Sequence, residues 1–84
     1  MATVRTTLVR VEVETGTSAE RELAEWLRRW RRRGVRRDGK PSYPHQGASM
    51  VLVFHAPEAA IADLERGFAG SSSAVVTRVP ADAG

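Results

Sequence analysis

SMVLVFHA, residues 49–56, is the stretch that decides the fold. It holds a continuous apolar run rich in β-branched residues, and it is too short for a helix of ordinary length. These properties predict a strand in the middle of a sheet, where other parts of the structure cover both of its sides. Alternation divides its apolar side chains between the two sides, with Met50, Leu52 and Phe54 on one and Val51 and Val53 on the other.

Upstream of this run lies an alternating segment, TTLVRVEVE, residues 6–14. Val9, Val11 and Val13 fall on one side of it and charged residues fall on the other, which predicts a half-buried strand. Gly16 follows the segment and is expected to end the strand.

A helix is predicted between these two strands, beginning at Thr17 or Ser18, which are good N-cap residues. Its apolar side chains recur at helical spacing and form one stripe, made of Ala19, Leu23, Trp26, Leu27 and Trp30. We therefore expect both tryptophans to be buried against the sheet. Gly34 is the expected end of the helix.

Downstream of the central strand, Pro57 is expected to begin a second helix, because proline is favoured in the first turn. AVVTRV, residues 74–79, predicts a last strand that Pro80 stops. Residues 35–48 contain two prolines and two glycines, so any edge strand hidden there must be short.

The order of elements predicts an α+β fold of the ferredoxin-like type, with two helices on one face of a mostly antiparallel sheet. The alternative is a three-stranded βαβαβ layer without the edge strand. Either way residues 1–80 are expected to form a single domain, and residues 81–84 a disordered tail.

Composition excludes several classes of protein. The chain has no cysteine, so it has no disulfide framework and no thiolate metal site. No stretch approaches the roughly 20 apolar residues of a membrane span, and no signal-peptide run is present near Met1. We expect a cytoplasmic protein that does not bind membranes.

Basic residues are concentrated in one block. Residues 28–40 carry eight positive charges and one negative charge, whereas the formal net charge of the whole chain is only +3. Arginine suits bidentate contact with carboxylate or phosphate. The block therefore predicts a basic binding patch made of Arg28, Arg32, Arg33, Arg36, Arg37 and Lys40. Its expected partner is an acidic protein, and the alternative is a nucleic-acid backbone.

The two-sided apolar strand raises a second expectation. Helices cover only one face of such a sheet, so apolar residues on the other face call for a partner. The sequence predicts a homodimer formed through a sheet face made of Leu8, Met50, Leu52, Phe54 and Val76.

No motif of catalytic strength is present, and neither a metal site nor a cofactor is predicted. Tyr43, His45 and His55 could converge on a pocket between subunits, which would suit a small-molecule binding protein or an enzyme. The favoured hypothesis is a small, non-catalytic protein-interaction module.

Overall fold

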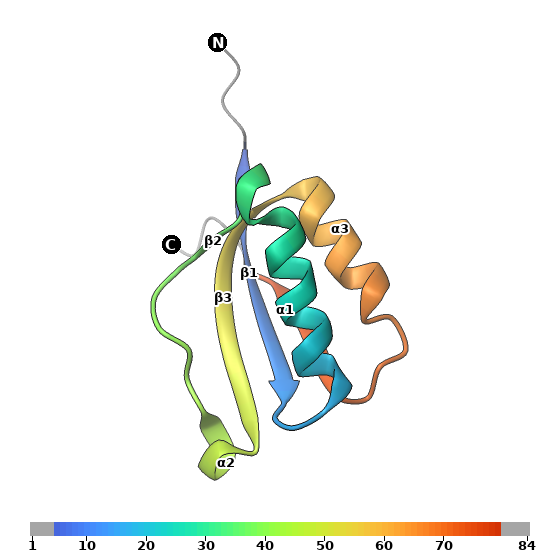
Figure 1. The fold of residues 1–84 in the computed structure, drawn as a ribbon. Helices are drawn as coiled ribbons and strands as arrows, with labels where there is room; N and C mark the ends of the chain where they lie inside the picture. Colours follow the sequence, from blue (N-terminus) through green and yellow to red (C-terminus); the bar gives the residue numbers. More distant parts are fainter. Residues whose placement is uncertain (1–4, 80–84) are drawn as a thin grey trace.

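The computed structural model describes residues 5–79 and contains a four-stranded antiparallel sheet in the order β2-β3-β1-β4. Helices α1 and α3 lie side by side on one face of this sheet (Figure 1). The elements are β1 (Thr6–Glu14), α1 (Ser18–Trp30), the 3-10 turn η1 (Arg31–Arg33), β2 (Arg36–Arg37), α2 (Pro44–Gly47), β3 (Ser49–Pro57), α3 (Glu58–Gly67) and β4 (Ala74–Arg78). The predicted ferredoxin-like α+β sandwich is confirmed.

The alternative without an edge strand is wrong, because Arg36 and Arg37 pair with His55 and Phe54 of β3. The chain after β2, residues 38–48, continues along this edge as a strap. The strap donates the Asp38 N–H to the Val53 carbonyl oxygen at 2.7 Å, and Ser42 exchanges two backbone hydrogen bonds with Val51 at 2.8 and 3.0 Å.

The register of β1 against β3 determines which side of the sheet is the core. Val9 lies opposite Phe54, Val11 opposite Leu52, and Val13 opposite Met50. The three valines of β1 are fully buried beneath the helices. Opposed residues in an antiparallel pair share a face, so the side of β3 that carries Phe54 also faces the helices.

This register corrects the predicted dimer face. Met50, Leu52, Phe54 and Val76 all lie on the helix-covered side, since Val76 pairs with Val11. Leu8, which lies opposite His55, is the one residue of the predicted set on the open side. The error has a physical cause. A strand that is apolar on both sides lacks the alternation of apolar and polar residues that would indicate which side faces the core.

Helix α1 begins as predicted but ends at Trp30, and the 3-10 turn η1 continues the helical stretch to the predicted stop at Gly34. Thr17 is its N-cap, and the Glu20 carboxylate accepts a hydrogen bond from the Gly16 N–H at 2.9 Å. That bond satisfies a backbone donor at the helix start and places negative charge at the positive end of the helix dipole. Gly34, with φ of 107°, terminates η1 in the left-handed conformation that glycine adopts without strain.

The two tryptophans of α1 have different environments. Trp26 is 3% exposed, meets the Phe54 ring edge-on at 5.3 Å, and donates from Nε1 to the Ala60 carbonyl oxygen at 2.8 Å. Trp30 is only partly buried and donates from Nε1 to Asp63 Oδ2 at 2.7 Å. The predicted burial is confirmed for Trp26. Trp30 is partly buried against the core and also joins α1 to α3.

Among residues 5–79, no helix has the length and apolar character needed to cross a bilayer. The expected disordered tail, residues 81–84, lies outside the described residues.

Candidate binding surface

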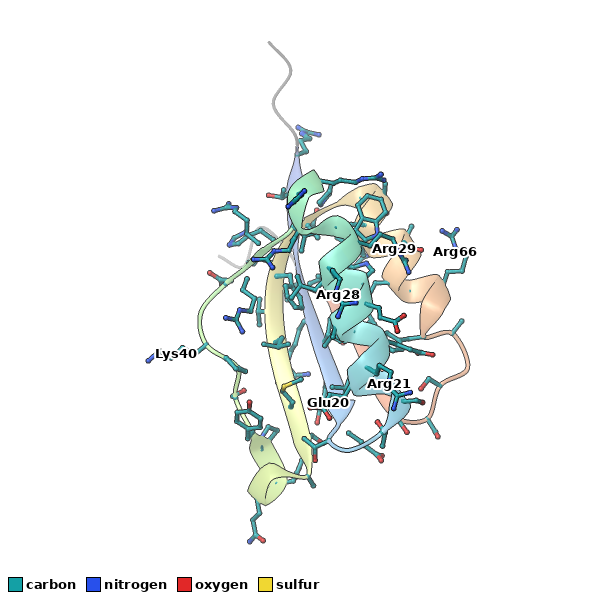
Figure 2. All side chains as sticks on the ribbon, viewed as in Figure 1. Glu20, Arg21, Arg28, Arg29, Lys40 and Arg66 are labelled. Carbon is teal, nitrogen blue, oxygen red and sulfur yellow. The ribbon has the colours of Figure 1, made fainter. Side chains whose placement is uncertain are left out.

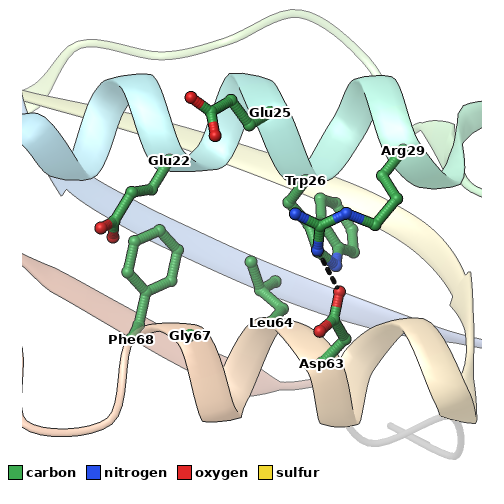
Figure 3. Close-up of a pocket in the computed structure, with 8 residues that line it drawn as sticks. All are labelled: Glu22, Glu25, Trp26, Arg29, Asp63, Leu64, Gly67 and Phe68. Carbon is green, nitrogen blue, oxygen red and sulfur yellow. Dashed lines mark hydrogen bonds and ion pairs between the residues drawn. The ribbon is translucent and has the colours of Figure 1, made fainter.

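One group of arginines is held by carboxylates of α3. Arg29 Nη1 lies 2.7 Å from Asp63 Oδ2, and Arg66 Nη2 lies 3.6 Å from Asp63 Oδ1 (Figure 3 shows the first contact). The same carboxylate accepts the indole hydrogen bond of Trp30. Arg29, Trp30, Asp63 and Arg66 thus form a polar junction between α1 and α3, which we call the Asp63 seam.

The seam changes the acidity of its carboxyl group. The hydrogen bond from Trp30, followed by the hydrogen bond and the charge of Arg29, lowers the pKa of Asp63 below its ordinary value of 3.8. The carboxylate is therefore the stable form in the folded protein at neutral pH.

Arg78 at the end of β4 is also paired. Its guanidinium contacts both oxygens of Glu58 at 2.7 Å and contacts Glu65 at 2.9 and 3.0 Å. These bonds lower the pKa of both glutamates and raise the pKa of Arg78. They fasten the edge strand β4 to α3.

The second group of arginines lies around the end of α1 and is exposed. One hollow is lined by Arg28, Arg31 and Arg32. A second is lined by Leu27, Arg31, Val35, Arg36 and Arg37, so the two hollows share Arg31. We call the five arginines of these hollows the arginine patch: Arg28, Arg31, Arg32, Arg36 and Arg37.

Within residues 5–79, none of the patch guanidinium groups takes part in an ion pair. Glu25 lies three residues before Arg28 on α1, a spacing that allows an ion pair, but the two do not pair in the described chain. All five residues are exposed.

The patch differs from the predicted set at three positions. Arg33 lies over the Trp30 ring, 5.6 Å from its centroid, and so supports the seam by a cation–π contact. Lys40 projects from the strap, well away from Arg29 and Arg66 (Figure 2), and lines neither hollow. Arg31 is the residue that sequence reasoning missed. Its spacing of three residues from Arg28 was a usable signal, because positions three apart are neighbours on a helix surface.

The three pocket candidates do not converge within one subunit. His55 lies opposite Arg36 and its Nε2 is 3.4 Å from Asp38 Oδ1. Tyr43 follows Ser42, which pairs with Val51, four residues and roughly 13 Å further along β3. Tyr43 is 56% exposed, and His45 belongs to the left-handed turn of α2, with φ of 55°.

A groove of about 250 Å³ lies between α1 and α3 (Figure 3). Trp26, Leu64 and Phe68 line its apolar part, and Glu22 and Glu25 stand at its rim. The Asp63 seam lies at one end of the groove. We therefore attribute the groove to the packing of α1 against α3 around this paired carboxylate. Among the described residues no three His, Cys, Asp or Glu side chains gather to hold a metal ion.

No family model and no curated protein matches this sequence. Among solved structures, the fold is similar to that of the uncharacterized protein TM1266 from Thermotoga maritima, with 23% sequence identity and a TM-score of 0.64. The alignment covers 95% of this chain and 100% of that one. At this identity the similarity supports the fold alone.

Proposed function

We propose that this protein is a small, non-catalytic protein-interaction module whose arginine patch binds an acidic segment of a partner protein. The observation that carries the proposal is the arrangement around two adjoining hollows of five exposed arginines, none of which forms an ion pair with another described residue. A cytoplasmic location belongs to the same proposal.

Structural demands account for only part of this cluster. Cations near a helix C-terminus are favourable by about 0.3–1 kcal/mol each, which gives Arg31 and Arg32 a structural use. The effect fades within the last turn, so it does not extend to Arg36 and Arg37 in β2. The cluster therefore carries more positive charge than the helix end requires.

The chemistry of the patch suits carboxylates. A guanidinium has five N–H donors in a planar fork and can hold a carboxylate through two parallel hydrogen bonds. Three like charges around one hollow repel one another, and an anion seated among them relieves that repulsion. A segment with several Asp or Glu side chains could occupy both hollows at once.

A protein partner fits the surroundings better than a nucleic acid does. None of the strand residues on the open face within residues 5–79 is Phe, Tyr or Trp, and the strap adds a single exposed aromatic residue, Tyr43. The strands therefore lack the row of aromatic side chains on which single-stranded bases usually stack. The exposed carboxylates Glu22 and Glu25 precede the patch on the same helix and would repel a polyanion that tracked along α1. A short acidic peptide can stay within the corner formed by η1 and β2.

A binding role is also supported over a catalytic one by the separation of Tyr43 from His55 along β3. A reaction that used both residues would need a second subunit to complete the site. No interaction in the described chain joins a nucleophile to a base in the geometry that such chemistry requires.

The test is a binding titration with three labelled probes of similar charge: a peptide of about ten residues rich in Asp and Glu, a DNA duplex and a single-stranded RNA. Fluorescence anisotropy at about 0.15 M salt should show binding of the peptide in the micromolar range and weaker binding of both nucleic acids. The peptide with Gln and Asn in place of its acids is the control. Tighter binding of either nucleic acid at this salt would overturn the proposal in favour of a backbone-binding protein.

A further inference from the structure

The face of the sheet opposite the helices combines an apolar surface with a charged centre. The register places alternate residues of β1, β3 and β4 on this side. Its apolar residues are Leu8, Val51, Val53 and Val75. Val75 is 56% exposed, which is unusual for a valine in a strand.

Arg10 and Glu12 lie at the middle of this face, on the central strand β1. Their side chains are 43% and 26% exposed, and Arg10 Nη1 is 3.5 Å from Glu12 Oε1. In the row of Arg10 the neighbours are Val53 and Thr77.

In the next row, Glu12 lies between Val51 and Val75. A positive row and a negative row therefore stand side by side, each flanked by valine.

This pattern is complementary to itself under one symmetry operation. Consider two copies whose open faces pack together, with a two-fold axis between them. If the axis runs perpendicular to the strands and passes between the two rows, Arg10 of each copy lies over Glu12 of the other. The same operation places Val53 over Val51 of the second copy. An axis along β1 would instead place Arg10 over Arg10, which is repulsive.

We propose that the open sheet face is a homodimer interface in which Arg10 and Glu12 exchange partners across a two-fold axis perpendicular to the strands. The dimer has an alternating ring of four charges, with valines from both copies around it. Such an isologous contact uses the same patch on both subunits and closes at two copies. The four charges fix the register. Val53 and Val75 supply apolar burial, whereas Val51 is only 6% exposed within the subunit and adds little.

The size of the face sets the expected affinity. The strands β1, β2, β3 and β4 have nine, two, nine and five residues. At about 4.8 Å by 3.4 Å per residue, and with the strap that continues β2 along the edge, the face measures roughly 500 Å². Two such faces bury roughly 1,000 Å², at the low end of specific interfaces. The dimer should therefore dissociate in the micromolar range.

The proposal can be tested apart from the acidic partner, because Arg28, Arg31 and Arg32 lie on α1 and η1, on the helix-covered side of the sheet. Arg36, which lies opposite His55, is the one patch residue that shares the open face, so it is left unchanged in this test. Removal of Arg28, Arg31 and Arg32 should leave self-association unchanged. Loss of the dimer should likewise leave the patch intact, so either proposal can fail alone.

The test uses the full chain in sedimentation equilibrium. Glu12→Arg and Arg10→Glu should each weaken self-association by at least about a hundredfold, because like charges then face each other. A mixture of these two variants should form mixed dimers. Glu12→Arg is positive at both rows and Arg10→Glu is negative at both, so the two faces attract each other. Circular dichroism of each variant confirms that the chain is folded.

The exchanged variant Arg10→Glu with Glu12→Arg distinguishes the proposed axis from the alternative. It should form its own homodimer and should not pair with the native chain. Preferential pairing of the exchanged variant with the native chain would mean that the axis runs along the strands, which contradicts the proposal.

The second part of the test replaces an apolar residue of the face with a charged one. Val75→Asp should weaken the dimer by at least about tenfold, whereas the matched change Ala24→Asp, at an exposed site on α1, should not. A native chain that stays monomeric at millimolar concentration, or single charge variants that dimerise as well as the native chain, would overturn the proposal.

Discussion

Arg28 and Arg29 are adjacent in the sequence, yet they belong to two different regions. Arg29 points toward α3 and pairs with Asp63, and with Trp30 and Arg66 it builds the Asp63 seam. Arg28 lies with Arg31 and Arg32 around a hollow, without an ion pair in the described chain. The comparison teaches that a run of arginines divides by direction, because only the side chains that point along the α1–α3 contact meet a carboxylate.

The largest effect is expected where α1 is anchored. Trp26→Ala should lower the free energy of unfolding by about 3–5 kcal/mol, because it opens a cavity and leaves the Ala60 carbonyl oxygen without its indole donor. Denaturant unfolding followed by circular dichroism measures this change. A variant as stable as the native chain would show that Trp26 does not anchor α1 to the core.

The Asp63 seam should respond next. Asp63→Ala removes the acceptor of two hydrogen bonds, from Arg29 and Trp30, together with the ion pair to Arg66, and should cost about 1–3 kcal/mol. Asp63→Asn keeps an oxygen for Trp30 and should cost less. Equal costs for both variants would mean that charge, and not the Trp30 hydrogen bond, dominates the seam.

The smallest effect is a pH dependence. The pKa of Asp63 is lowered on folding from its ordinary value of 3.8, so its contribution to stability is complete above that value and is lost as pH falls through the folded pKa. Melting temperatures measured from pH 5 downward should therefore fall less steeply in Asp63→Ala than in the native chain. Parallel curves for the two proteins would show that the seam does not shift this carboxyl group.

Much of the fold is predictable from the sequence. The alternation of Val9, Val11 and Val13 indicates the first strand, and the stripe containing Leu23 and Trp26 indicates α1. These patterns are local, so they survive without any knowledge of the partner element.

Features that depend on contact between distant segments were not predictable. Whether the Phe54 side chain faces the helices depends on the register of β3 against β1, in which Phe54 lies opposite Val9. The sequence does not encode register locally. The position of Trp30 depends on Asp63, 33 residues later. The arginine patch was predicted in outline, but Arg31 was missed, although its spacing of three residues from Arg28 places the two on the same side of a helix.

The most direct test of the account compares two variants that each lose three positive charges. Arg28, Arg31 and Arg32 become Gln in the first, and Arg29, Arg66 and Arg78 become Gln in the second. Melting temperature and binding to the acidic peptide are measured on both. Both measurements are made at about 0.15 M salt, which screens the helix-end contribution of Arg31 and Arg32. Under these conditions the first variant should melt within about 2 °C of the native chain and bind at least about tenfold more weakly.

The second variant should melt at least about 3 °C lower and keep its affinity within about threefold. Gln is a good helix former, so neither change penalises α1 or α3 by propensity. If both variants lost affinity equally, net charge and not the patch would govern binding. If the first variant melted lower than the second, the patch would be part of the architecture and the division of the arginines would be wrong.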